Sequence, residues 1–179
     1  MCAQEAWWQL GLDGVVLMPV GDPAHREIEG DPGREGRMRL CEAAAAGVDW
    51  LTVSRVDVDR PGQTYTVDTL EDLRASKPDD EHVFLLGADQ ARELPGWREP
   101  ERVLELAQVA VAERGGVTSE SVEEALAGIG GEGRVVFFSM PRIDVSSTDV
   151  RRRVADGHPY RFLVPERVAD LIEREGLYR

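Results

Sequence analysis

Five short apolar runs alternate with segments whose apolar residues recur at helical spacing. The runs lie at 15–20, 50–56, 83–86, 109–112 and 135–138. Strands that are apolar on both faces and separated by helices are typical of a parallel sheet covered on both sides. The pattern therefore predicts a single doubly wound α/β domain over residues 1–179. Ligands of such folds bind at the carboxyl ends of the strands, so the segments after each strand are examined below.

Helices are predicted between these runs from their apolar periodicity and their end signals. The expected helices span 36–46, 66–77, 100–107, 119–126, 146–154 and 165–175. Thr66 is the expected N-cap of the second helix, because its hydroxyl can accept from the free amides of the first turn. Pro165 is expected as the first residue of the last helix. Gly47 and Gly176 are expected just past helix ends.

Charge excludes several classes of partner. The 179 residues carry 34 acidic and 21 basic side chains, for a formal net charge of −13. A surface this acidic disfavours non-specific binding to nucleic acid or to anionic membranes.

The longest apolar runs are far shorter than a membrane span, and no basic leader precedes Arg26. Cys2 and Cys41 form neither a metal-binding spacing nor a disulfide framework, so we expect a cytoplasmic protein.

The loop after the first predicted strand carries two cationic side chains, His25 and Arg26. A surface loop with an incidental histidine is one interpretation, and taken alone it is the simpler one. The other is a pair of donors at the carboxyl end of a strand, which would suit an anionic ligand.

The segment 63–70 places hydroxyls beside Tyr65 at the start of a predicted helix. Helix capping explains Thr66 without a ligand. Exposed amides at the same helix start could instead hold a carboxylate.

The third predicted strand ends at Gly87, and Asp89 and Trp97 follow. A glycine at this position lets a ligand approach the backbone, and the aspartate could accept hydrogen bonds from ribose hydroxyls. Trp97 could anchor the core or offer its face to an aromatic ring; the sequence leaves both open.

Three consecutive hydroxyls, Ser146, Ser147 and Thr148, stand at a predicted helix N-terminus. The spacing from Ser146 to Asp149 fits a capping box, which needs no ligand. The amides and dipole of this helix, with Arg151 one turn further on, would also suit a phosphate. Residues 142–179 hold eight arginines and seven acids, whereas the rest of the chain is strongly acidic.

Together these segments resemble ordered motifs of the bacterial nicotinate-nucleotide adenylyltransferases, which belong to the nucleotidyltransferase superfamily and have a Rossmann-like fold. The matching segments are 19–26 (family pattern P-x-G-x-P-P-H-K), 65–70 (Y-T-V-D-T-L), 87–97 (G-A-D…L-P-x-W) and 145–151 (I-S-S-T-x-I-R). The resemblance covers nearly the whole chain in the right order. Ala24, Arg26 and Val145 depart mildly from these patterns.

One departure is large. The family begins with a strand followed by G-G-T-F-D-P-x-H-x-G-H, and no such segment precedes Met1. We therefore expect an N-terminally truncated nucleotidyltransferase domain that lacks its first strand. The family's two H-x-G-H histidines have no counterpart here, so no catalytic residue and no metal ligand is assigned.

The resemblance implies a reaction and a set of binding residues. The reaction transfers the adenylyl group of ATP to nicotinate mononucleotide, giving deamido-NAD and pyrophosphate in NAD biosynthesis, with Mg²⁺ on the ATP polyphosphate. The implied ATP-binding residues are Ser146, Ser147, Thr148 and Arg151 at the phosphates and Gly87 and Asp89 at the ribose. The implied mononucleotide-binding residues are His25, Arg26, Tyr65, Thr66 and Trp97, with Trp97 stacked on the pyridine ring.

Two hypotheses follow. The chain is an NAD-biosynthesis enzyme that needs the preceding segment, or it is a non-catalytic nucleotide-binding remnant of the same fold. Both predict small-molecule partners, with no nucleic acid and no membrane, and both leave a homo-oligomer open.

Overall fold

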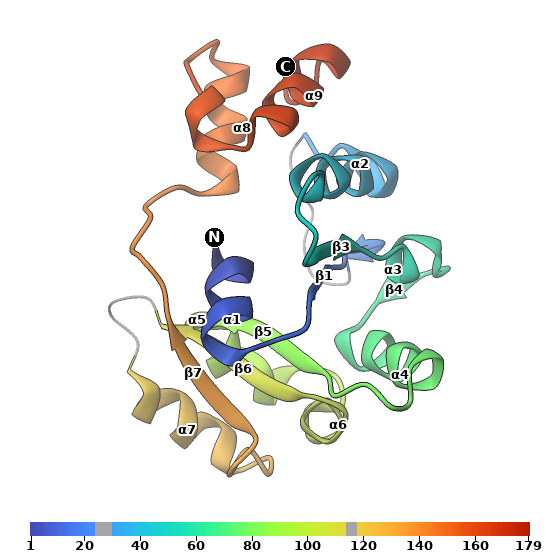
Figure 1. The fold of residues 1–179 in the computed structure, drawn as a ribbon, viewed down its shortest axis with the longest axis vertical. Coiled ribbons are helices and arrows are strands. Elements are labelled where there is room, and N and C mark those ends of the chain that lie inside the picture. Colours follow the sequence, from blue (N-terminus) through green and yellow to red (C-terminus); the bar gives the residue numbers. More distant parts are fainter. Residues whose placement is uncertain (24–29, 114–117) are drawn as a thin grey trace. The chain divides into compact units, whose positions relative to one another are not determined.

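The computed structural model describes residues 1–23, 30–113 and 118–179. Within them the chain divides into two compact units. The first comprises residues 1–13 and 65–142, and the second comprises residues 14–64 and 143–179. The segments that contribute to each unit are far apart in the sequence (Figure 1).

The first unit is built on a three-stranded parallel sheet of order β5-β6-β7. Its strands are β5 (Val83–Gly87), β6 (Gln108–Glu113) and β7 (Val135–Ser139). In the register Val83 pairs with Gln108, and Val109 pairs with Val135. These strands lie where the apolar runs predicted them.

Helices cover both faces of this sheet, and alternate side chains of β6 show why. Val109 and Val111 point into the larger core, whereas Ala110 and Ala112 belong to a smaller core with Ala6 of α1 (Cys2–Leu10). The small side chains on that face allow α1 to pack against β6 and β7. The larger core takes in the helices α4 (Thr66–Ser76), α5 (Ala88–Glu93), α6 (Pro100–Leu106) and α7 (Ser119–Ala127), with the 3₁₀ turn η1 (Leu94–Gly96).

The second unit contains two short parallel strand pairs and a helical core. β1 (Val15–Leu17) pairs with β3 (Leu51–Val53), and β2 (Asp22–Pro23) pairs with β4 (Gln63–Thr64). Its helices are α2 (Gly33–Ala45), α3 (Val56–Asp59), α8 (Ser147–Ala155), η2 (Arg161–Leu163) and α9 (Glu166–Glu175). Val154 of α8 packs with Val168 and Ile172 of α9, and α2 contacts α9.

The structure confirms the parallel α/β, Rossmann-like class and corrects two helix ends. The prediction that Thr66 is an N-cap is wrong: Tyr65 holds that position and Thr66 is the first helical residue. Pro165 stands at the N-cap rather than inside the helix, because its ψ of 144° is extended. Gly47 and Gly176 have the positive φ expected past a helix end, 84° and 63°. In the described ranges, no helix has the length and apolarity needed to cross a membrane.

Candidate functional site

The N-terminus of α4 is anchored by burial and lacks a side-chain cap. Val67 and Leu70 are buried in the larger core and fix the helix on the sheet. Tyr65 precedes the helix in extended geometry and supplies no capping hydrogen bond. The Thr69 hydroxyl donates to the Tyr65 carbonyl at 3.2 Å, a purely structural hydrogen bond within this segment. The N-cap residue therefore does not satisfy the first-turn amides with its own side chain.

Trp97 follows the η1 turn, whose Leu94 is fully buried. The Trp97 amide donates to the Leu94 carbonyl at 2.9 Å. Its ring meets Phe84 edge to face, with centroids 6.2 Å apart and planes at 68°. The ring is only partly buried against the larger core. Trp97 thus has a packed edge and an accessible part, so the two interpretations of this residue are compatible.

Arg98 joins the Trp97 segment to Tyr65. Its guanidinium carbon lies 4.8 Å from the centre of the Tyr65 ring, a cation–π contact. Its Nη1 lies 3.4 Å from an Asp68 carboxylate oxygen on the first turn of α4. The structure therefore brings together three predicted site residues of the first unit, Tyr65, Thr66 and Trp97. Sequence reasoning missed Arg98, although its position directly after Trp97 was the available signal.

The backbone just after Arg98 is strained. Glu99 has φ 50° and ψ 57°, in the left-handed region that non-glycine residues rarely adopt. It occupies the N-cap position of α6, directly before Pro100. Such conformations cost on the order of 1–3 kcal/mol and persist where the surrounding fold imposes them. The fold therefore fixes the direction in which the chain leaves Arg98.

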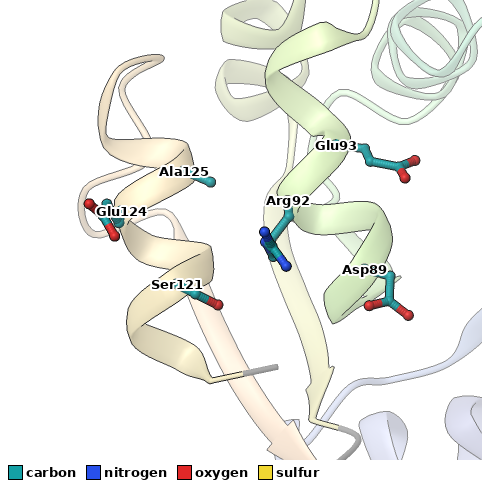
Figure 2. Close-up of a pocket in the computed structure, with 6 residues that line it drawn as sticks. All are labelled: Asp89, Arg92, Glu93, Ser121, Glu124 and Ala125. Atoms are coloured by element: carbon teal, nitrogen blue, oxygen red, sulfur yellow. The ribbon is translucent and has the colours of Figure 1, made fainter. Parts of the chain in front are cut away.

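Gly87 and Asp89 lie at the carboxyl end of β5. A Cβ at Gly87 would meet no atom of the described residues within 4 Å, so these residues do not require glycine there. Asp89 is exposed in the first turn of α5. It lines an open pocket of about 590 Å³ between α5 and α7 (Figure 2). The other lining residues are Arg92, Glu93, Ser121, Glu124 and Ala125. With three carboxylates and one guanidinium, this pocket would repel a polyphosphate, and the ribose contact of Asp89 stays a prediction.

The predicted phosphate site forms the N-terminus of α8 in the second unit. The Ser146 hydroxyl accepts from the Asp149 amide at 3.0 Å, which is the N-cap half of the predicted capping box. The Asp149 carboxylate contacts Arg152 at 2.6 Å instead of returning to the cap. Arg151 donates to the Thr148 hydroxyl at 3.2 Å. Ser147 and Thr148 are exposed, so hydroxyls, amides and one guanidinium share this helix start.

His25 and Arg26 lie outside the described residues, so their predicted contact with the mononucleotide stays a prediction. The predicted site is thus divided. Tyr65, Thr66, Gly87, Asp89 and Trp97 belong to the first unit. Ser146, Ser147, Thr148 and Arg151 belong to the second.

Comparisons with known proteins identify the family. Residues 2–153 match the cytidylyltransferase-like family model. A protein of Thermomicrobium roseum named "Probable nicotinate-nucleotide adenylyltransferase" is 38% identical over 172 residues, which cover 96% of this chain and 80% of that protein. A Streptomyces coelicolor protein of the same name is 38% identical over 179 residues, covering 100% of this chain and 92% of that protein.

Solved structures show the same fold. The chain resembles the nicotinic acid mononucleotide adenylyltransferase of Plasmodium falciparum, solved in complex with APC, with a TM-score of 0.71 at 15% identity. That match covers 99% of this chain and 88% of the other. The complex of the Plasmodium protein with NaAD matches with a TM-score of 0.68. Given its family-model match and its identity to relatives along most of their length, the chain belongs to the cytidylyltransferase-like nucleotidyltransferases and, within them, to the bacterial nicotinate-nucleotide adenylyltransferase family.

Proposed function

We propose that the chain serves in NAD biosynthesis by transferring the adenylyl group of ATP to nicotinate mononucleotide. A phosphate oxygen of the mononucleotide attacks the α-phosphorus of ATP, and the bond from that phosphorus to the bridging oxygen of the β-phosphate breaks. The products are deamido-NAD and pyrophosphate. Because both reactants are anions, the protein contributes mainly positioning and charge neutralisation.

The observation that carries this proposal is the arrangement around the N-terminus of α4. One unit holds the partly exposed Trp97, Tyr65 and the start of α4, whose N-cap Tyr65 makes no side-chain cap. The contact of Arg98 with Tyr65 joins the Trp97 segment to this helix start. An aromatic face beside cationic and amide donors suits a flat ring that bears a carboxylate. The pyridine ring of nicotinate has that chemistry.

The ATP side of the proposal is argued for each unit by itself. At the start of α8, the Ser147 and Thr148 amides and the Arg151 guanidinium are suited to phosphate oxygens. Gly87 leaves space for the adenosine ribose, and the exposed Asp89 can accept from its hydroxyls. No group of three or more His, Cys, Asp or Glu side chains suited to a metal is found in the described residues. We propose that Mg²⁺ bound to the ATP polyphosphate would neutralise part of its charge.

The test is an assay of pyrophosphate release with ATP, Mg²⁺ and nicotinate mononucleotide. It compares the 179-residue chain with a fusion that carries a family G-G-T-F-D-P-x-H-x-G-H segment ahead of Met1. The three histidines of this sequence, at 25, 82 and 158, do not form an H-x-G-H motif. We therefore expect turnover only from the fusion, which carries that motif. A folded fusion that releases no pyrophosphate would overturn the proposal.

The alternative function is nucleotide binding without turnover by the same fold. It predicts that calorimetry detects mononucleotide binding while neither protein releases pyrophosphate. A titration without binding heat would exclude it.

A further inference from the structure

We infer that the outer edge of β7 pairs with β7 of a second copy of this chain and joins two three-stranded sheets into one. β7 is the last strand in the order β5-β6-β7, so one of its sides faces no other strand of the described residues (Figure 1). No residue of β7 belongs to the predicted nucleotide site, so this pairing is independent of the proposed function.

The free backbone groups of this edge follow from the ladder between β6 and β7. The Val109 amide donates to the Arg134 carbonyl at 2.9 Å, and successive strand residues turn their backbone groups to opposite sides. Val135 and Phe137 therefore turn their N–H and C=O groups outward, and no residue that the structure describes bonds to these groups. An unpaired strand edge of this kind is a template for another strand.

The sequence leaves this edge unprotected over a short length. Residues 135–138 are all apolar, whereas exposed strand edges are usually blunted by charge or proline. At the next outward residue, the Ser139 amide donates to Gln9 Oε1 at 3.1 Å and the Ser139 carbonyl accepts from Gln9 Nε2 at 2.7 Å. Gln9 of α1 thus occupies the strand end and limits a docking strand to residues 135–137. Trp8, which precedes Gln9 on α1, is 74% exposed and offers further apolar area.

A second copy satisfies this short edge in an antiparallel register. A two-fold axis through Val136 sets Val135 opposite Phe137 of the partner subunit, and these outward residues then exchange both of their hydrogen bonds. The same pair recurs on the other side of the axis, so every outward group of Val135 and Phe137 is bonded in both copies. A shift of one residue would set outward groups against inward ones and lose these bonds.

Charge at the two ends of the strand favours this occupant. A hollow of about 460 Å³ at the start of β7 is lined by Val135 and by four carboxylates, those of Glu120, Glu123, Glu124 and Glu132. An antiparallel partner brings the end of its own β7 to this start, and Arg142 follows that end closely in the sequence. The partner's Arg142 therefore approaches the acidic hollow, and the two-fold axis repeats this contact.

The first experiment is sedimentation velocity of the full chain over a range of concentrations. We expect a monomer–dimer equilibrium with a dissociation constant on the order of 10–100 µM, since pairing over three residues falls at the weak end of interface sizes. Val135→Pro removes an outward N–H but no hydrogen bond to β6, so it should weaken the dimer by about tenfold or more.

The matched control is Val83→Pro. Val83 is likewise the first residue of its strand, and the bond from the Gln108 amide to the His82 carbonyl shows that the Val83 N–H turns away from β6. Its outward N–H therefore lies on the opposite edge of the sheet. This variant should leave the dimer unchanged, and thermal melts check that both proline variants fold.

A cysteine cross-link tests the register without any proline variant. In a background with Cys2→Ala and Cys41→Ala, Val136→Cys places a thiol opposite its own copy, within disulfide reach across a pair that shares no hydrogen bonds. Oxidised glutathione should then give a covalent dimer on a non-reducing gel. Val83→Cys in the same background should stay monomeric.

Three outcomes overturn the pairing and leave adenylyl transfer untouched. A wild-type chain that stays monomeric up to about 1 mM would leave this edge to solvent or to a strand of another protein. A dimer that both proline variants retain, or that only Val83→Pro dissociates, would place the contact elsewhere. If Val135→Pro does not fold, the cysteine variants decide, and a Val136→Cys chain that cross-links no faster than Val83→Cys refutes the pairing.

Discussion

Arg98 and Tyr65 are 33 positions apart in the sequence, yet the guanidinium of one lies 4.8 Å from the ring centre of the other. This contact ties the segment that follows η1 to the start of α4, and both segments rest on the same core. The aromatic and cationic parts of the predicted mononucleotide site therefore belong to one folded unit.

A double-mutant cycle should measure this contact. Tyr65→Leu and Arg98→Met each remove one partner, and we expect a coupling free energy of roughly 0.5–1 kcal/mol, the usual strength of a partly exposed cation–π pair. The measurement is urea unfolding of the wild type, both single variants and the double variant. Arg102→Met combined with Tyr65→Leu is the control and should show no coupling. A Tyr65–Arg98 coupling indistinguishable from that control would mean that the contact contributes nothing to stability.

Trp97→Ala should have two separable effects. Loss of the stacking face should weaken binding of nicotinate mononucleotide by about 1–3 kcal/mol. Loss of the edge contact with Phe84 should lower the free energy of unfolding by roughly 2–3 kcal/mol, less than for a fully buried aromatic residue. Titration and urea unfolding measure the two effects. Trp97→Phe, which keeps a ring, should retain much of both. Lowered stability with unchanged affinity would show that Trp97 serves the core alone.

Local pattern was sufficient to predict the three strands of the larger sheet and most helices, whereas the two-residue strands β2 and β4 were missed and the runs at 15–20 and 50–56 form strands only at 15–17 and 51–53. The runs at 83–86, 109–112 and 135–138 are apolar on both faces because helices cover both sides of β5, β6 and β7. The cap of α4 was predicted wrongly because a hydroxyl rule favoured Thr66, whereas burial of Val67 and Leu70 sets the helix start one residue earlier. This error is small, because it moves the helix start by one residue.

The parts of the site that depend on tertiary contacts could not be predicted from local sequence. The stacking of Arg98 on Tyr65 depends on how the long Arg98 side chain turns just before the left-handed Glu99, and no periodicity encodes that. The helical turn that continues through α5 into η1 was also missed, because its buried Ala91 and Leu94 are too few to form a periodic pattern. Motif order identified the candidate residues, and the fold showed which of them share a unit.

Alanine variants of Ser146 and Ser147 should distinguish helix capping from ligand binding at the N-terminus of α8. Ser146→Ala removes the hydroxyl that accepts from the Asp149 amide and should lower the free energy of unfolding by about 1 kcal/mol. Ser147 is exposed, so Ser147→Ala should change stability by less than about 0.5 kcal/mol. If Ser147 contacts the ATP phosphates, its variant should bind MgATP several-fold more weakly in a calorimetric titration. Full affinity in Ser147→Ala would assign this helix start to capping alone.

The variants Gly87→Ala and Gly21→Ala form a matched pair. The first tests whether a ligand approaches the backbone at Gly87, and the second tests how tightly the chain packs at Gly21. A Cβ at Gly87 meets open space and its φ of −76° suits alanine, so Gly87→Ala should keep or slightly raise stability. It should nevertheless weaken MgATP binding, because the added methyl occupies the space proposed for the ribose. A Cβ at Gly21 would overlap the Asp57 carbonyl oxygen, so Gly21→Ala should be strongly destabilising. Thermal melts and MgATP titrations of both variants measure these effects. Unchanged MgATP affinity in a stable Gly87→Ala variant would remove Gly87 from the nucleotide site.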